Sequence, residues 1–219
     1  MLTTSKISKY YNDESCCLLL HSDTFDGDSA IRDYSLNNLP VTVNGNVFNR
    51  NTYGFDCGGS GIHFHTVGDT IDVENINTGY GDWFLWCYTR VLLVNNSNYQ
   101  SLIEFFTDDR KFICTVKVRH YYIYVRLYLN DNLIKNGYVE LSYNSTTPQA
   151  FHFEFRYYNG KLYAYVNNSE TWNYNIKLPS MTHLRFGNWE YNDRDIYLHQ
   201  LIINKKDTLN SHTNCITNI

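Results

Sequence analysis

The sequence has few prolines, no cluster of basic residues and no hydrophobic run long enough to cross a membrane. Only three of its 219 residues are proline, and asparagine serves as the main turn-forming residue. The formal net charge is −4, so the basic surface typical of nucleic-acid-binding proteins is missing. The apolar runs fall far short of a transmembrane helix. We therefore expect a protein that neither binds nucleic acid nor spans a membrane.

Two further patterns are not found in the sequence: that of a signal peptide in its first residues and that of paired cysteine motifs. The first residues have neither the basic start nor the apolar core of a signal peptide. There are six cysteines, but no Cys-x-x-Cys pair and no zinc-type spacing occurs among them. Cys87 and Cys114 lie in apolar stretches, where a free cysteine packs as a small hydrophobic residue. We expect reduced structural thiols in a protein made in a cytosol; a disulfide is the alternative.

Helical periodicity is also missing, and the alternation typical of β-strands takes its place. It is clearest between residues 151 and 168, where every second position of the first half is aromatic. These aromatic residues are Phe151, Phe153, Phe155 and Tyr157. Asn159-Gly160 then predicts a tight turn, because both residues tolerate positive φ. The segment is expected to be a β-hairpin with one face in a core.

About a dozen such short strands, separated by polar turns, follow one another along the chain. This pattern predicts an all-β fold, a two-sheet antiparallel β-sandwich of the jelly-roll type, with the aromatic stripes taken in the first instance as core. No linker rich in Pro, Gly or Ser divides the chain, so we expect one sandwich domain over residues 16–205. Residues 1–15 and 206–219 are polar and are expected to form an N-terminal arm and a C-terminal tail.

Several motifs follow one another in the order of a known family. They include a short apolar strand ending in histidine at 18–21, a glycine pair before a strand at 58–59, the segment Gly81-Asp82-Trp83 and a last strand at 198–205. On these motifs the chain resembles concanavalin A-like lectin/glucanase domains of the laminin-G and pentraxin type, found in phage and bacterial surface proteins. The resemblance implies a concanavalin A-like jelly roll, calcium at the rim of the sandwich and a role in binding carbohydrate.

Relatives that cleave glucans carry a Glu-x-Asp-x-x-Glu strand, which places two carboxylates on one face at the spacing of a retaining mechanism. This sequence has no such triplet; Asp72-Val73-Glu74 is among the nearest matches and fails the spacing. The Gly-x-Ser-x-Gly elbow of a serine hydrolase is also missing. The sequence therefore predicts a protein that is not an enzyme and has no catalytic residues.

The candidate ligand-binding residues are four aromatic side chains and one asparagine in two polar segments that we expect to be loops. They are Trp172, Tyr174, Trp189, Tyr191 and Asn192. A sugar ring stacks its C–H face on Trp or Tyr, while amide groups bond its hydroxyls. The alternative is that these aromatics cap the ends of the sandwich or pack against a neighbouring subunit. We expect the working surface to be a loop end carrying these residues, and not a sheet face.

Two acidic segments are candidate calcium sites, because Ca²⁺ prefers oxygen ligands. The first offers Asp23, Asp26 and Asp28, and the second, before the last strand, includes Asp193 and Asp195. Neither segment has the spacing of an EF-hand, and solvated acidic turns without a metal are the alternative. Calcium is the candidate cofactor at these two segments.

His63 and His65 are a further candidate pair of metal ligands. They are two residues apart and so share a strand face, where they could bind zinc or nickel together. Two partly exposed strand histidines without a metal are the preferred interpretation.

The sequence is compatible with two functions. The first is a non-enzymatic structural or adhesive protein of a virion, such as a capsid or tail decoration that attaches to host glycans. Such a protein is made in the host cytoplasm and forms a homo-oligomer with other virion or surface proteins as partners. The second is a stand-alone carbohydrate-binding module, or the binding domain of a carbohydrate-active enzyme, at an extracellular or cell-surface location. A glycan array and the oligomeric state separate the two.

Overall fold

The computed structural model describes residues 13–22, 26–55, 59–92, 98–141, 148–188 and 195–205, with side chains for all of these except 51–55, 59 and 60. Within these ranges the chain forms fifteen β-strands and no helix. The predicted all-β fold is confirmed. None of the described segments is a helix that could span a lipid bilayer.

The strands belong to two antiparallel sheets, called sheet A and sheet B. Sheet A contains β1 (Cys16–His21), β3 (Phe48–Phe55), β4 (Gly59–Phe64), β6 (Trp83–Val91), β11 (Gln149–Tyr158), β12 (Lys161–Val166), β13 (Ser169–Asn175) and β15 (Ile196–Asn204). Sheet B contains β2 (Val41–Asn44), β5 (Asp69–Val73), β7 (Gln100–Phe106), β8 (Phe112–Arg119), β9 (Tyr122–Leu129), β10 (Asn132–Glu140) and β14 (His183–Asn188).

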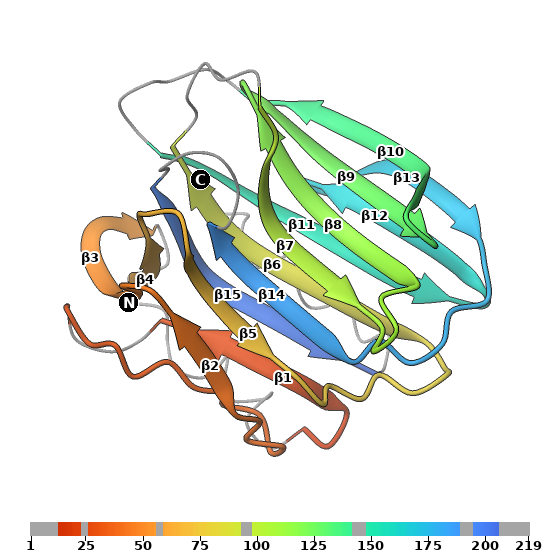
Figure 1. The fold of residues 1–219 in the computed structure, drawn as a ribbon, viewed down its shortest axis with the longest axis horizontal. Coiled ribbons are helices and arrows are strands. Elements are labelled where there is room, and N and C mark those ends of the chain that lie inside the picture. Colours follow the sequence, from red (N-terminus) through yellow and green to blue (C-terminus); the bar gives the residue numbers. More distant parts are fainter. Residues whose placement is uncertain are drawn as a thin grey trace.

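The two sheets lie face to face as a sandwich, which confirms the predicted architecture (Figure 1). Sheet A has the order β13-β12-β11-β6-β15-β4-β3, and sheet B the order β10-β9-β8-β7-β14-β5-β2. Two short strands share one side of β15: β4 pairs with residues 196–198 and β1 with residues 200–204. All strand pairs of the two sheets are antiparallel, and about half of them join strands that are not consecutive in the sequence.

The hydrophobic core lies between the sheets and is built from the inward faces of their strands. Near its centre, the indole ring of Trp83 on β6 meets the ring of Phe105 on β7 edge-on, with 5.4 Å between the ring centroids. Phe153 and Phe155 on β11 are fully buried in the same cluster. Burying a side chain of this size stabilises a fold by about 1.5–3 kcal/mol.

The predicted hairpin is present as β11 and β12. Asn159 and Gly160 form its turn with φ values of 50° and 72°, as two-residue hairpin loops favour. The outer face of β11 is less exposed to solvent than its polar residues suggest, because His152 and Glu154 are buried as well. His152 Nε2 lies 2.9 Å from Asn168 Oδ1, so a side-chain pair covers part of this face.

A second, smaller hydrophobic cluster lies on the outer face of sheet A. Its buried members are Cys16, Leu19, Phe84, Trp86 and Ile202. The segment after β1 crosses this face: the backbone N–H of Tyr34 donates to the carbonyl of Leu19 at 2.8 Å, and the Asp33 carboxylate accepts from the N–H of Leu19 at 2.9 Å. Because β1 has buried residues on both faces, its sequence is almost continuously apolar.

The described cysteines are free, buried thiols, in agreement with the preferred interpretation of the sequence. They are Cys16, Cys17, Cys87 and Cys114. Burial raises the pKa of Cys17 to about 11 and that of Cys87 well above its ordinary value. These thiols therefore stay protonated and act as small packing groups. Cys57 and Cys215 lie outside the described residues.

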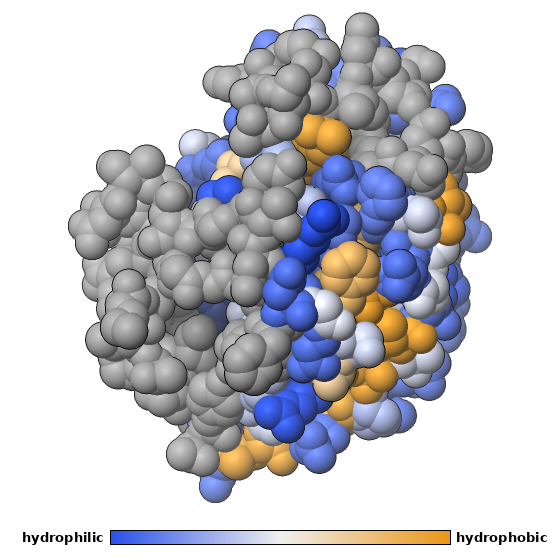
Figure 2. Space-filling model, turned by 90° about the vertical axis from the view of Figure 1, so that its left-hand side faces the viewer, coloured by the Kyte–Doolittle hydropathy of each residue, from blue (hydrophilic) through white to orange (hydrophobic). Residues whose placement is uncertain are grey.

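The side of the sandwich shown in Figure 2 carries a band of hydrophobic side chains beside areas of hydrophilic ones, as far as its described residues show. Most of the predicted arm, residues 1–12, and the whole predicted tail, residues 206–219, lie outside the described residues. The division of the chain into an arm, a domain and a tail stays a prediction.

Candidate functional site

The structure places two of the candidate binding residues in a strand instead of a loop. Asn167 and Asn168 form a two-residue turn with φ values of 49° and 65°, so the chain re-enters sheet A at once as β13, which contains Trp172 and Tyr174. Trp172 is buried, and its Nε1 donates a hydrogen bond to the carbonyl of Val125 in sheet B at 2.7 Å. The expected loop position of Trp172 is wrong, and its ring instead links the two sheets.

Tyr174 is half-buried, and the ammonium group of Lys135 lies 5.2 Å from the centroid of its ring. The other three candidates, Trp189, Tyr191 and Asn192, lie outside the described residues. Their proposed part in ligand binding stays a prediction.

Two of the four aspartates expected to bind calcium, Asp23 and Asp193, lie outside the described residues. Asp26 is exposed. The carboxylate of Asp28 accepts a hydrogen bond from the backbone N–H of Ala30 at 2.9 Å, so it stabilises its own turn. Calcium binding by these residues stays a prediction.

His63 and His65 share a face, as expected, and the structure brings a third residue to them. Asp195, just before β15, has its Oδ1 2.7 Å from His63 Nε2 and 2.8 Å from His65 Nδ1. The hydrogen bond from His63, helped by that from His65, lowers the pKa of the Asp195 carboxyl against the opposing effect of burial. The sequence suggested grouping Asp195 with an acidic loop; its contacts are with two histidines.

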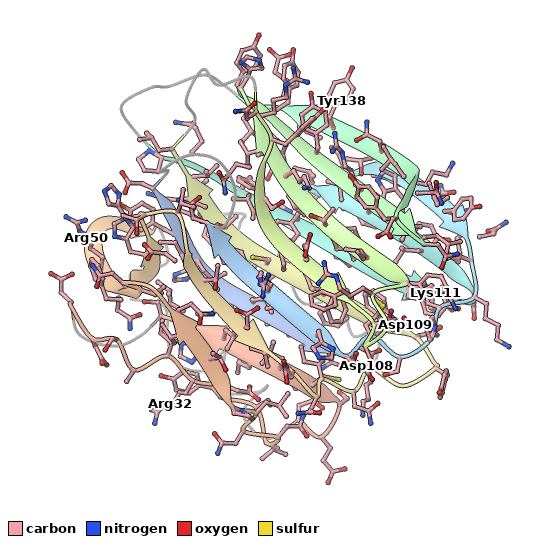
Figure 3. The ribbon with its side chains drawn as sticks, viewed as in Figure 1. Arg32, Arg50, Asp108, Asp109, Lys111 and Tyr138 are labelled. Carbon is pink, nitrogen blue, oxygen red and sulfur yellow. The ribbon has the colours of Figure 1, made fainter. Side chains whose placement is uncertain are left out.

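A group of aromatic and cationic side chains covers the outer face of sheet B over β8, β9 and β10. We call it the tyrosine–arginine platform. It consists of Tyr99, Tyr122, Tyr124, Tyr138, Arg119 and Arg126. Tyr138 is 61% exposed. Figure 3 shows it toward one end of these strands, whereas Asp108 and Asp109 lie in the β7–β8 turn at the other end.

Strand alternation explains why these side chains lie together. In β9, Tyr122, Tyr124 and Arg126 occupy every second position, and residues between them, such as Val125, are fully buried in the core. Pairing of β9 with β10 then places Tyr138 opposite Tyr124. The aliphatic positions take the core, which leaves the tyrosines and the arginine on the outside.

The tyrosine rings fix one another's orientation. The rings of Tyr99 and Tyr124 meet edge-on with 5.0 Å between centroids, and those of Tyr122 and Tyr138 do the same at 5.5 Å. Edge-to-face pairs are a favoured arrangement of aromatic rings and contribute about 0.5–1.5 kcal/mol each. The platform is therefore a preformed surface.

The two arginines are held by aromatic and amide groups. The guanidinium carbon of Arg126 lies 4.0 Å from the centroid of Tyr99 and 5.1 Å from that of Tyr124, and its Nε donates to Asn136 Oδ1 at 2.8 Å. A guanidinium nitrogen of Arg119 donates to the Tyr99 hydroxyl at 3.5 Å. The Nε of Arg119 is buried and has no hydrogen-bond partner among the described residues.

Other arginines associated with sheet B are neutralised by carboxylates. Arg110 pairs with Glu104 at 2.8 Å and Arg185 with Asp72 at 2.6 Å. In the described part of the chain, neither arginine of the platform forms such an ion pair. The platform thus carries two positive charges, one half-buried on Arg119 and one buried on Arg126, beside the exposed ring of Tyr138.

Neighbouring side chains shift the pKa values of two tyrosine hydroxyls of the platform in opposite directions. Burial would raise the pKa of Tyr99, but the hydrogen bond from Arg119 and the charge of Arg126 outweigh it and lower that pKa. A hydrogen bond with Tyr121 raises the pKa of Tyr122 to about 12. Tyr99 is therefore a polarised acceptor, while Tyr122 stays a neutral hydroxyl at physiological pH.

These observations define the class of the molecule: a two-sheet antiparallel β-sandwich with a rigid aromatic and cationic surface on one sheet. No family model matches the sequence, and no curated protein matches it either. The comparison with solved structures, by contrast, finds the same fold in a group of toxin domains.

The chain superposes on the receptor binding domain of the botulinum neurotoxin C/D mosaic serotype with a TM-score of 0.71 and 19% identity, covering 93% of this chain and 51% of that one. For the botulinum neurotoxin serotype D binding domain the TM-score is 0.69 and the identity 20%, covering 88% of this chain and 48% of that one. For the botulinum neurotoxin serotype D ligand binding domain in complex with N-acetylneuraminic acid the TM-score is 0.68 and the identity 19%, covering 91% of this chain and 49% of that one.

This chain spans about half the length of these solved domains. At such low identity the likeness shows the sandwich fold alone. The two-sheet sandwich implied by the family resemblance is confirmed, and its assignment to the concanavalin A-like type stays a proposal.

Proposed function

We propose that this chain is a non-enzymatic glycan-binding domain whose binding surface is the tyrosine–arginine platform. The observation that carries the proposal is the combination of one exposed and three half-buried tyrosine rings with two arginines that have no carboxylate partner among the described residues. The ligand class that fits both features is an oligosaccharide with a carboxylate, such as one ending in a sialic acid.

The aromatic part of the platform suits the apolar faces of sugar rings. Tyr138 exposes most of its ring, and its neighbours Tyr122 and Tyr124 hold it in place at 5.5 and 5.8 Å between centroids. Because the tyrosine ring is already held in place, it loses little conformational entropy when a sugar stacks on it. The tyrosine hydroxyls and the Asn136 amide can bond sugar hydroxyls along the same face.

The cationic part suits an acidic group on the sugar. Guanidinium–carboxylate hydrogen bonds are among the stronger polar contacts in proteins. Arg119 is the better candidate for direct contact, because its side chain is only half-buried and forms no ion pair with a carboxylate of the described residues. Arg126 is more deeply buried and positions Tyr99 and Tyr124 through its contacts with both rings.

The structural neighbours support a binding function in general terms. Their names describe receptor binding and ligand binding domains, and one is a complex with N-acetylneuraminic acid. Because this chain spans about half of those domains, the proposal rests on the chemistry of its own platform and not on the position of their ligands.

The proposal moves the expected working surface from a loop end to a sheet face. The loop-end surface was expected to include Trp172, which lies in the core. A virion setting, homo-oligomer formation and the alternative extracellular location stay predictions.

A direct test measures the affinity of the chain for 3′-sialyllactose and for lactose, which differ only in the acidic sugar. We expect the chain to prefer sialyllactose. Tyr138→Ala should weaken binding of both sugars by about 5- to 30-fold, because it removes about 1–2 kcal/mol of ring contact. Arg119→Gln should weaken sialyllactose binding and leave lactose binding almost unchanged.

Tyr158→Ala is the matched control, since Tyr158 is 42% exposed but lies on β11 of the other sheet. It should bind like the unchanged chain. Equal affinities for the two sugars, or equal losses in Tyr138→Ala and Tyr158→Ala, would contradict the proposal.

A further inference from the structure

The cluster of His63, His65 and Asp195 lies in sheet A, where β4 ends and its neighbour β15 begins. β4 and β15 pair with Phe64 opposite Ile196, so one step further along the pairing His65 faces Asp195. His63 is two residues before His65 and projects from the same face. The three ligand atoms, one from each side chain, lie within 4.8 Å of one another.

We propose that this cluster is a binding site for a divalent transition metal ion, with Zn²⁺ as the preferred occupant. Two imidazole nitrogens and one carboxylate oxygen form a donor set typical of zinc, whereas Ca²⁺ prefers oxygen ligands. Both nitrogens already lie 2.7–2.8 Å from the same atom, Asp195 Oδ1. Tetrahedral zinc needs ligand atoms about 3.3 Å apart, so each nitrogen–oxygen distance has to widen by only about half an ångström.

The buried ligand is held by its neighbours. The His63 ring is 2% exposed and stacks on the Tyr197 ring, with 4.5 Å between centroids and 7° between planes. The Phe48 ring meets it edge-on at 5.4 Å. These contacts hold the imidazole plane, so little freedom remains to be lost when an ion binds.

The backbones of the other two ligands are fixed as well. The N–H of His65 donates to Asp69 Oδ2 at 2.9 Å, and its carbonyl accepts from Asn188 Nδ2 at 3.3 Å. The carbonyl of Asp195 accepts from the N–H of Leu92 at 2.8 Å. The ligands thus come from two strand ends that are tied to different parts of the sandwich.

The site is open on one side. The side chains of His65 and Asp195 are 59% and 25% exposed, so water can complete the coordination of an ion and exchange is possible. His63 Nδ1 is buried without a hydrogen-bond partner among the described residues. Metal-bound histidines usually donate through their second nitrogen, and lacking that acceptor weakens binding about 10- to 100-fold. We therefore expect Zn²⁺ to bind about 10- to 100-fold more weakly than at a site whose histidines both have such an acceptor.

The test is a titration of the chelator-treated chain with ZnCl₂ by calorimetry, together with thermal unfolding with and without Zn²⁺. We expect one Zn²⁺ per chain and a higher melting temperature in its presence, because the ion binds the folded state. His65→Asn should lose at least about 10-fold in affinity. Asp195→Asn should also lose affinity, although its amide oxygen can still accept hydrogen bonds from the imidazoles.

His120→Asn is the matched control. His120 lies in the β8–β9 turn with φ 52°, a conformation that asparagine tolerates, and it is not part of the cluster. This variant should bind Zn²⁺ like the unchanged chain. The proposal is overturned if the unchanged chain binds no Zn²⁺ at one per chain, if His65→Asn binds equally well, or if Ca²⁺ competes equally for the same site.

Discussion

Replacing Trp172 by alanine tests whether this residue belongs to the core or to a binding surface. Its ring fills the space between β13 and sheet B, where Gly137 of β10 leaves room for it. A Cβ atom on Gly137 would lie only 2.7 Å from Trp172 Cδ1. The indole Nε1 also donates to the Val125 carbonyl at 2.7 Å, so one side chain provides both packing and an inter-sheet hydrogen bond.

The expected loss of stability follows from these two contributions. Truncating a buried tryptophan to alanine typically costs about 3–5 kcal/mol. Trp172→Phe keeps much of the apolar contact but loses the donor, which should cost about 1–2 kcal/mol. In urea, with a slope of about 2–3 kcal/mol per molar, Trp172→Ala should lower the unfolding midpoint by roughly 1–2 M without a change in slope.

The control is Tyr158→Ala, a change at a partly exposed aromatic residue of the same sheet, which should stay within about 0.5 kcal/mol of the unchanged chain. A Trp172→Ala variant as stable as this control would refute the reasoning, and so would normal stability combined with a loss of glycan binding. Binding per folded molecule should be nearly unchanged, because the ring is not on the platform.

Two further changes test buried polar groups. Burial lowers the pKa of His152 against the effect of its hydrogen bond with Asn168. Below about pH 6.5 the unfolded chain therefore binds more protons than the folded chain does. The free energy of unfolding should fall between pH 7 and 5 by more than it does in His152→Gln, which urea midpoints at both pH values can show. The Asp69 carboxylate accepts three backbone N–H groups at 2.8–2.9 Å, which outweigh burial and lower its pKa. Asp69→Asn should cost about 2–3 kcal/mol at pH 7 and reduce the further loss of stability below about pH 4; an unchanged urea midpoint would disprove this role.

Local sequence signals predicted the strands and their class well, because alternation and turn chemistry act over a few residues. The hairpin at 151–168 is a clear case: Asn159 and Gly160 have the positive φ values that the pattern implied. The same reasoning misplaced Trp172, because a polar setting was taken for a loop. Ser169 to Asn175 is polar in sequence, yet it pairs along β12 and sends Trp172 into the core.

The platform was within reach of the sequence, but aromatic stripes in general were expected to be core. Tyrosine is both a good core residue and a good surface residue of a strand, so an aromatic stripe by itself does not identify the buried face. In β9 the competing stripe settles the question, because it is aliphatic and its members Ile123, Val125 and Leu127 are fully buried. Where tyrosine and arginine alternate with valine, isoleucine and leucine, the aliphatic stripe takes the core.

The metal cluster shows a different kind of limit. His63 and His65 carry a local signal, since residues two apart on a strand share a face. Asp195 is 132 residues from His63, and nothing in the spacing of the chain connects them. They meet because β15 lies beside β4 in the sheet order and because the pairing of Phe64 with Ile196 sets their register. A shift of this register by one residue would move Asp195 to the other face and leave two histidines without a carboxylate. The chemistry of the cluster is therefore a property of strand order, which side-chain patterns within single strands do not encode.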